Sequence, residues 1–401
     1  MIHAYFREGE INGYSAEQRN SYKFFRHDHK FESASSFFNF PLKTQEDQRY
    51  IYPIRLTGML VNRLFTFLPK NHVFHIPDSV LADIKNNKCK LVFDYSAEPF
   101  NCTYKNKMDL TDYFVRATMM HYGLTKEQVI LTTANVKIYK DVPYTVCVLF
   151  RPITFIPCAA KEWTSKQIDL IKSKADRKFK MLSLMRQTKM HRIKFAYDIF
   201  RHNYRDDNLI TCHLPKNKNH FRRINYIPEC EDREFFNSLP WAYDDPSKDY
   251  NAFLNTEVEQ TMYLDSYVNI VIESFVEFVG ETTAEYELDI SEKIFKPISR
   301  MQPFVVYGQP GILAYLKSIG YKTFDNWWDE SYDSIEDSAA RYQMIFDIFK
   351  MLTHKSKAEL ANMLYDMLPI LEHNRSLFDK YVKEQRYLDE FNEVLAASFD
   401  K

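Results

Sequence analysis

The chain has 401 residues, a net charge of −1, 45% apolar residues and 16% aromatic residues, which is enough for two domains with sizeable cores. It contains only 8 glycines, and neither GxGxxG nor GxxxxGK[ST] occurs in it. The composition therefore argues against a glycine-rich nucleotide enzyme. Any bound phosphate must be held by side chains and helix starts.

Six cysteines form no CxxC pair and no zinc spacing, which is typical of reduced intracellular thiols. The first ten residues do not have the pattern of a signal peptide. The most apolar stretch, 144–160, is interrupted by Arg151, Pro152 and Pro157, so we expect no membrane span. These features predict a soluble cytoplasmic protein, in the host cytoplasm if it is viral.

Residues 1–50 are aromatic and polar without a clear period, and they predict irregular chain or short strands. His27 and His29 suggest a pair of metal ligands, with His72 and His75 in reserve, but no third ligand can be identified. Exposed loop histidines are the favoured alternative. We expect no metal site.

From residue 90 the pattern sharpens. An apolar strand over 90–95 contains Asp94, and Glu98 lies in the loop that follows it. A helix over 110–122 ends at Gly123, and a second strand spans 128–132. A strand, a helix and a strand with short connections predict a βαβ unit with parallel strands, the first Rossmann-like half.

The middle of the chain is basic. Residues 161–225 hold 17 Lys and Arg against 6 Asp and Glu, a net charge of +11 in a chain that is otherwise acidic. This excess indicates a polyanionic partner or a phosphate pocket, and a solvated helical linker is the alternative. The charged, helix-prone stretch 163–178 is the predicted domain boundary.

A second βαβ unit begins with an apolar strand over 179–184. The loop after it contains Arg186 and Lys189, and Arg192 lies near the start of the next helix. A third segment, from 209, starts another strand. Cations at a helix N-terminus are disfavoured by the helix dipole, so this cationic loop indicates a bound anion.

A strand over 267–275 contains Glu273, and a charged helix start follows with Ser291, Glu292, Lys293 and Lys296. A buried strand over 304–307 and a helix over 312–319 complete the unit. Ligands of such units bind at the carboxyl ends of the strands. A surface helix with an ion pair is the alternative interpretation.

The run Ser291-Glu292-Lys293, followed by Pro303-Phe304 and the turn Gly308 to Gly311, resembles the donor-site motif of fucosyltransferase-type and viral glycosyltransferases. The basic turn and helix after residue 184 are similar to the start of the donor half in related enzymes. In that family the strand before the motif closes in Glu-Asn-Ser. Here Ser274 follows Glu273 directly, so the contact made by the Asn is absent.

The resemblance implies an α/β chain of the GT-B class, with two Rossmann-like domains facing across a cleft and helices at the C-terminus. The expected domains are 1–165 on the acceptor side, 178–345 on the donor side, and a helical segment 346–401 that packs back on the body. The activity implied is transfer of a sugar from a UDP- or GDP-sugar to a hydroxyl group, without a metal or another cofactor. The donor-binding residues would be Arg186, Lys189, Arg192, Glu273, Ser291, Glu292, Lys293 and Lys296.

An inverting transfer needs a carboxylate to accept the proton of the acceptor hydroxyl. Glu98 and Asp94 follow or end a strand of the first half, where such a base belongs. The loop from Glu98 to Asn101 is also similar to the base-holding loop of some bacterial fucosyltransferases, although its Ser is missing. An ordinary loop acid is the alternative for Glu98.

The acceptor prediction rests on the basic segment. Some phage glycosyltransferases of similar appearance modify hydroxymethylated bases, so double-stranded DNA is one predicted acceptor. Its contacts would be Lys216, Lys218, Arg222 and Arg223. A glycan or a protein acceptor, or a non-catalytic module that binds nucleotides or nucleic acid, stays open.

Overall fold

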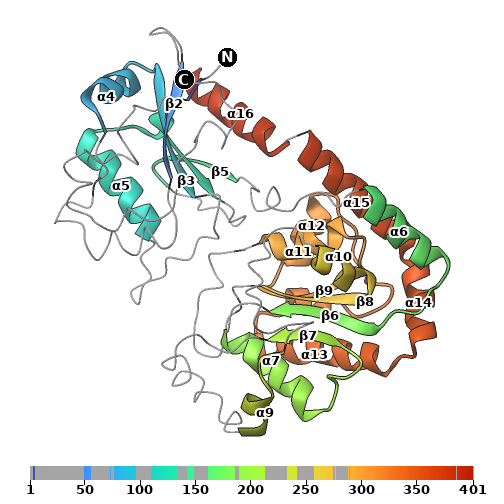
Figure 1. Ribbon diagram of the computed structural model, residues 1–401. Coiled ribbons are helices and arrows are strands. Elements are labelled where there is room, and N and C mark those ends of the chain that lie inside the picture. Colours follow the sequence, from blue (N-terminus) through green and yellow to red (C-terminus); the bar gives the residue numbers. More distant parts are fainter. Residues whose placement is uncertain are drawn as a thin grey trace. The chain divides into compact units, whose positions relative to one another are not determined.

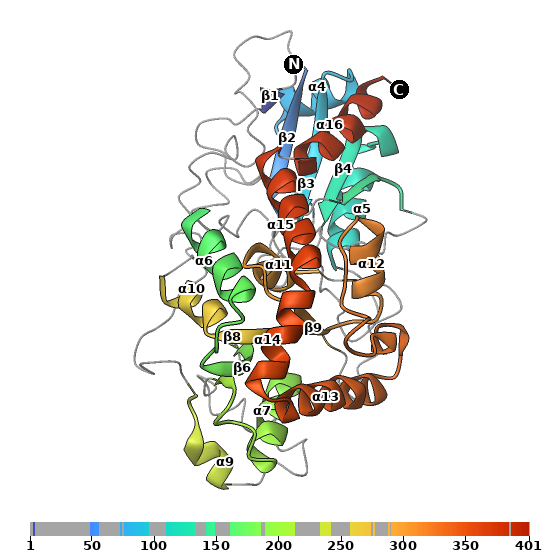
Figure 2. The ribbon, with the colours of Figure 1, turned by 90° about the vertical axis from the view of Figure 1, so that its right-hand side faces the viewer.

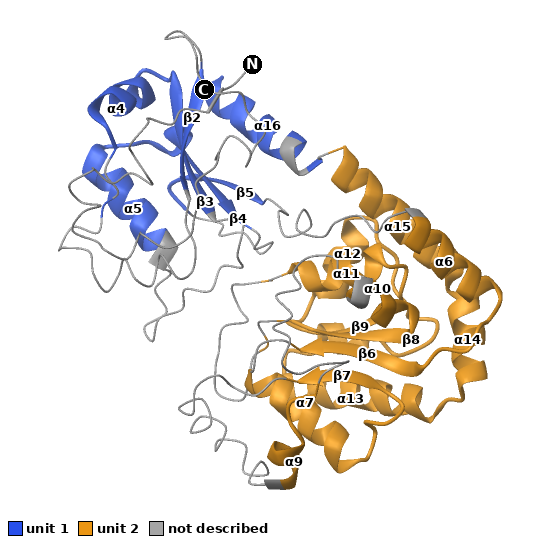
Figure 3. Ribbon diagram, in the orientation of Figure 1, with its two compact units in different colours: residues 1–152, 385–401 blue, residues 153–384 orange. Residues whose placement is uncertain are grey.

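The structure is a computed structural model. It describes residues 3–4, 49–55, 73, 76–95, 110–133, 142–148, 161–185, 189–212, 233–241, 257–273, 276, 288, 290–384 and 386–400. The chain divides into two compact units, with unit 1 formed by residues 1–152 and 385–401 and unit 2 by residues 153–384 (Figure 3). No helix among the described residues is long and apolar enough to cross a membrane.

Unit 1 is a parallel sheet with helices. Its elements are β1 (His3–Ala4), β2 (Tyr50–Arg55), α4 (Asp78–Lys85), β3 (Cys89–Tyr95), α5 (Leu110–Tyr122), the 3-10 turn η2 (Lys126–Gln128), β4 (Val129–Thr133), β5 (Thr145–Val148) and α16 (Arg386–Phe399). The strands lie in chain order, β1-β2-β3-β4-β5, and all neighbouring pairs are parallel. In Figure 1, α4 and α5 lie on one side of this sheet and α16 on the other.

Unit 2 contains the second parallel sheet. Its first elements are α6 (Lys161–Lys172), β6 (Phe179–Met185), α7 (Met190–Arg201), β7 (Leu209–Cys212), α9 (Arg233–Ser238), α10 (Glu257–Leu264) and β8 (Ser266–Ile272). They are followed by α11 (Glu292–Ser299), β9 (Phe304–Tyr307), α12 (Ile312–Ser318), the 3-10 turn η4 (Ser331–Ser334), α13 (Ser338–His354), α14 (Lys357–Asp366) and α15 (Leu368–Lys383).

The strand order of the second sheet is β7-β6-β8-β9, again with parallel neighbours. Every residue of β8 and of β9 is buried, as expected for the Val- and Ile-rich strands of a sheet that is covered on both faces. Figures 1 and 2 show α7 and α13 on one face of this sheet and α10, α11 and α12 on the other.

The predicted α/β fold class is confirmed, because both halves are parallel sheets with helices. The two βαβ units are found as β3–α5–β4 and β6–α7–β7, with parallel strands in each. The boundary between the two units lies at 152/153, before the charged stretch 163–178 in which we predicted a domain boundary. Of the predicted C-terminal helical segment, α14 and α15 belong to unit 2, and α16 belongs to unit 1.

Candidate functional site

The candidate site lies at the point where the strand order of unit 2 changes direction. The chain moves from β6 outward to β7, then returns to the other side of β6 for β8 and β9. In open α/β sheets, ligands bind outside the carboxyl ends of the strands at such a switch point. Glu273 directly follows the last residue of β8, and its backbone N–H donates to Tyr307 O of β9 at 2.9 Å, so this end of the sheet fixes it.

Ser291 connects Glu273 to the start of α11. Its side chain is the N-cap of this helix and accepts a hydrogen bond from the backbone N–H of Lys293 at 3.2 Å. The same hydroxyl donates to Glu273 Oε2 at 2.5 Å. The cap of α11 and the carboxylate at the end of β8 are therefore held together by one side chain.

Lys293 completes a network of charges. Its Nζ donates to Ser291 Oγ at 3.0 Å and to Glu292 Oε1 at 3.0 Å, and it lies 3.8 Å from Glu273 Oε2. Burial opposes the charge of Lys293, but Glu273 and Glu292 outweigh burial and raise its pKa. Burial likewise acts to raise the pKa of Glu292, but the charge and hydrogen bond of Lys293 hold that pKa below its ordinary value. Both groups are charged near neutral pH.

The first turn of α7 is attached to the same end of β8. Arg192 Nη2 donates to Ile272 O at 3.0 Å, and His191 Nε2 lies 3.0 Å from Glu273 O. A carbonyl oxygen only accepts, so Nε2 carries the imidazole proton. Burial, with the positive charges of Arg192 and Lys189, lowers the pKa of His191 to about 3, and the ring is neutral.

Glu273 itself is only 1% exposed, and within the described part of the chain its Oε1 atom has no hydrogen-bond partner. A buried carboxylate oxygen left without a donor costs free energy, so this atom is suited to a donor from outside the network. Gly308 makes room beside it. A Cβ on Gly308 would lie 3.3 Å from Glu273 Cγ and would overlap Ile312 Cδ1.

The predicted donor residues therefore divide into three groups. Glu273, Ser291, Glu292, Lys293 and Arg192 come together at the switch point, with Lys189 at the N-cap of α7. Lys296 donates to Glu259 Oε1 of α10 at 2.8 Å, and its positive charge also acts to lower the pKa of Glu292. Arg186 lies outside the described residues. Sequence reasoning missed the parts played by His191 and Glu259, because hydrogen bonds to a backbone carbonyl and between two helices leave no local pattern.

The predicted base candidates belong to unit 1. Asp94 of β3 is 2% exposed, and its Oδ1 accepts a hydrogen bond from Thr132 Oγ1 of β4 at 2.8 Å. Glu98 lies outside the described residues, as do the predicted DNA contacts Lys216, Lys218, Arg222 and Arg223. The roles of these residues stay predictions.

No metal site is formed by the residues that the structure describes, since they contain no group of three His, Cys, Asp or Glu side chains that could hold an ion. The pair His27 and His29, with His72 and His75, falls outside them.

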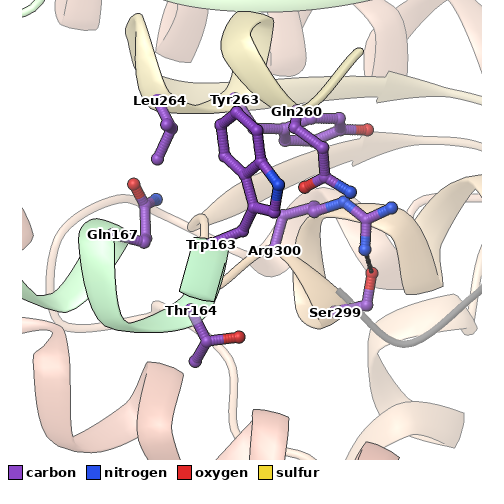
Figure 4. A pocket seen from close by; sticks show the side chains of 8 residues that line it. All are labelled: Trp163, Thr164, Gln167, Gln260, Tyr263, Leu264, Ser299 and Arg300. Atoms are coloured by element: carbon purple, nitrogen blue, oxygen red, sulfur yellow. Dashed lines mark hydrogen bonds between the residues drawn. The ribbon is translucent and has the colours of Figure 1, made fainter. Parts of the chain in front are cut away.

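A small open hollow lies elsewhere in unit 2 (Figure 4). It encloses about 220 Å³, including space open to solvent, and residues of α6, α10 and the end of α11 line it, among them Trp163, Gln260 and Arg300. Leu264 in its wall lies two residues before the start of β8, so the hollow lies at the amino ends of the strands. It is separate from the cluster around Glu273.

No protein-family model matches the sequence, and no characterised protein matches it significantly. Among solved structures, the catalytic domain of starch synthase IV from Arabidopsis thaliana, bound to ADP and acarbose, is similar to this chain. The TM-score is 0.41 and the sequence identity 8%, and the match covers 88% of this chain and 73% of that one.

Proposed function

We propose that this chain is a glycosyltransferase that moves a sugar from a nucleotide-sugar donor to a hydroxyl acceptor, and that unit 2 binds the donor. The observation that carries the proposal is the cluster of Glu273, Ser291, Glu292 and Lys293 at the switch point of a parallel sheet. The pKa of Glu292 is lowered and that of Lys293 is raised, and charged groups with shifted pKa values at such a place form a candidate functional site on physical grounds.

The two carboxylates suit the hydroxyl groups of the donor. An ionised carboxylate only accepts hydrogen bonds, and ribose and hexose hydroxyls supply the donors. Glu273 Oε1 is a buried acceptor that has no hydrogen-bond partner among the described residues. Lys293 holds one oxygen of Glu292 at 3.0 Å and thereby sets the direction of its carboxylate.

The cations suit the diphosphate. Negative charge develops on the leaving nucleotide diphosphate, and positioned cations and helix N-termini stabilise it. The first turn of α7 contains no acidic residue, and its N-cap residue is Lys189. We place the phosphates near this helix start and near Lys293, and we infer a UDP- or GDP-sugar as the donor.

A panel of nucleotide sugars tests the proposal directly. The chain is incubated with each donor and a set of hydroxyl acceptors, and the release of nucleotide diphosphate is measured. We expect release with at least one donor, and slower release in Glu273→Gln when the donor is below saturation. The matched control is Glu259→Gln, which removes the carboxylate that accepts from Lys296 in the same unit. A folded protein that binds no nucleotide sugar would end the proposal.

For the acceptor we propose double-stranded DNA with hydroxymethylated bases. The support is the +11 charge of residues 161–225, in which Lys172 and Lys178 are exposed. Part of this charge serves the fold instead, since Lys180 pairs with Asp207 at 3.0 Å and Lys194 pairs with Asp198 at 2.7 Å.

Binding of duplex DNA at increasing salt tests the acceptor. We expect the logarithm of the binding constant to fall by about 0.9 per phosphate contacted for each tenfold rise in salt. To reach a base, the enzyme must also flip the nucleotide out of the stack, at a cost of a few kcal/mol. No affinity at about 50 mM salt, with or without hydroxymethylated bases, would leave a glycan or a protein as the acceptor.

A second candidate is a non-catalytic module that binds nucleotides or nucleic acid. The burial of Asp94 and its hydrogen bond to Thr132 favour this reading, because a general base must reach the acceptor. The assay of nucleotide diphosphate release distinguishes the two candidate functions. The module would bind a nucleotide sugar and release no nucleotide diphosphate with any acceptor.

A further inference from the structure

Lys90 of unit 1 is a buried cation that the proposed reaction does not use. It lies in β3 and is 1% exposed. Its Nζ donates to Asn87 Oδ1 at 2.7 Å, to Glu127 O at 2.8 Å and to Ser398 O at 2.5 Å. An ammonium group has three donors, and all three are used. Burial lowers the pKa of Lys90 to about 8, because removal from water disfavours the charged form of the amine.

The third acceptor belongs to the far end of the chain. Ser398 is the second-to-last residue of α16, and the last four carbonyls of a helix have no partner within the helix. The C-terminal end of a helix also carries partial negative charge, which a cation stabilises. Lys90 therefore contacts α16 at its C-terminal end, where a positively charged donor stabilises a helix.

Other residues of unit 1 contact the same helix end. Asn87 Nδ2 donates to Phe399 O at 3.0 Å. Lys90 Nζ lies 4.9 Å and Arg49 Cζ 5.3 Å from the centroid of the Phe399 ring. Both distances are within the range of a cation–π contact. The end of α16 is thus recognised through its carbonyls and through its last aromatic ring.

The body of α16 packs by one face. Phe391, Leu395 and Phe399 are buried and spaced four residues apart, which places them on one side of the helix. A terminal helix that is held by one narrow face and a few polar contacts belongs to the part of a fold that opens most easily.

The connectivity gives this contact a consequence. The chain leaves unit 1 at 152/153, forms all of unit 2, and returns to unit 1 at 384/385 through α16. While α16 is docked, unit 2 is joined to unit 1 at both of its ends. If α16 undocks, the covalent link at 152/153 is unchanged, and the link at 384/385 no longer leads into a docked helix.

We propose that the surface of unit 1 formed by Arg49, Asn87 and Lys90 is a receptor for the C-terminal end of α16. In this chain α16 acts as a clasp that docks there reversibly and closes the second connection between the units. Lys90 is the residue that recognises the docked helix. The proposal stands independently of the glycosyltransferase function, since it uses none of the residues around Glu273.

Amide hydrogen exchange of the full chain tests the clasp. In Lys90→Met we expect the amides of 391–399 to exchange about 10- to 100-fold faster, because charge-assisted hydrogen bonds are lost while acceptors stay buried. The amides of β4 and of unit 2 should keep their protection. Lys88→Met is the matched control, because Lys88 is exposed two residues earlier, and it should leave α16 unchanged.

A second variant guards against a folding defect in Lys90→Met. Phe399→Ala alters α16 alone and should also speed exchange in 391–399, and the double variant should add little to either single change, because both act through one contact. Wild-type exchange of α16 in Lys90→Met would overturn the proposal. So would equal loss of protection throughout unit 1 in both variants, since α16 would then be an inseparable part of that unit.

Discussion

Units 1 and 2 are both parallel α/β sheets, but they differ in how their described strands are ordered. The strands of unit 1 follow the chain, β1-β2-β3-β4-β5, whereas those of unit 2 run β7-β6-β8-β9 and change direction beside β6. The charged cluster is in unit 2, at this change of direction. Asp94 of unit 1, on the third strand of a sheet without such a change among its described strands, is bonded to Thr132 of the neighbouring strand.

The difference teaches that parallel sheets alone do not make a ligand site. Both units have a buried carboxylate near the carboxyl end of a strand. Asp94 of unit 1 is 2% exposed, and Glu273 of unit 2 is 1% exposed. In unit 2, Ser291 and Lys293 contact the side chain of Glu273 from the connection that follows β8. His191, in the first turn of α7, contacts the backbone carbonyl of Glu273 from the connection that follows β6. A change in winding direction brings such connections together at one point of the sheet edge.

The largest expected effect is a fall in the transfer rate when a candidate base of unit 1 is replaced. If unit 1 supplies the base, Glu98→Gln or Asp94→Asn should lower the transfer rate by about 10²–10⁴-fold and leave donor affinity near the wild-type value. Single-turnover kinetics with the donor found in the panel, together with donor binding, measure both quantities. A loss of donor affinity in either variant would place that residue in the donor site and remove the contrast between the units.

Lys293→Met tests the cation of the cluster. We expect donor affinity to fall by about 10- to 100-fold, because a charge-assisted contact to the donor is lost and Glu273 and Glu292 lose their counter-charge. Lys296→Met is the matched control, since Lys296 bonds to Glu259. Titration calorimetry with the nucleoside diphosphate measures both. An equal loss in Lys296→Met would instead give Lys296 the donor-binding role that the sequence predicted.

Gly308→Ala tests the packing that seats Glu273. The added Cβ would overlap Ile312 Cδ1, so we expect unit 2 to lose about 1–3 kcal/mol of unfolding free energy. Ile312→Val removes the overlapped methyl group, and the double variant should recover part of this loss. All four tryptophans of the chain lie in unit 2, so their fluorescence during denaturation reports on this unit. No loss in Gly308→Ala would show that the turn relaxes freely.

The pH dependence of unit 2 should carry a smaller effect from His191. Its pKa is about 3 in the folded protein, against an ordinary value of 6.5, so the unfolded state binds the proton more tightly. The contribution of His191 to the unfolding free energy should therefore be fully present above pH 6.5. It should be lost as the pH decreases toward 3, by up to about 1.4 kcal/mol per pH unit. In His191→Gln this slope should be shallower. An unchanged slope would show that His191 does not stay buried and neutral.

Much of the fold was predictable because its signals are local. The helix 110–122 and the strand 304–307 were predicted with the bounds that the structure has, from apolar spacing, Gly123 and Pro303. Strand β2 was not predicted, and it contains Pro53, which cannot donate to a strand ladder. Helix α4 was also missed, although the acidic Asp78 in its first turn, directly after Pro77, is a local start signal.

The site was predictable in part for the same reason. Ser291, Glu292 and Lys293 are adjacent in sequence and share a helix start, and Glu273 lies near the end of the strand predicted over 267–275, which the structure ends at Ile272. That Ser291 joins the two could not be inferred, because the contact spans 18 residues and depends on how β8 lies against α11. The bond from Lys296 to Glu259 is likewise a pairing of two helices, and only the packed structure specifies it.

The most direct test of the central claim is the affinity of the nucleotide-sugar donor for Glu273→Gln, measured by titration calorimetry beside wild type and Glu259→Gln. We predict that Glu273→Gln weakens binding by at least about tenfold, because an amide replaces the carboxylate that accepts the donor hydroxyl. Glu259→Gln should bind as wild type does. Equal affinities in all three proteins would contradict the claim that the donor binds at the switch point of unit 2.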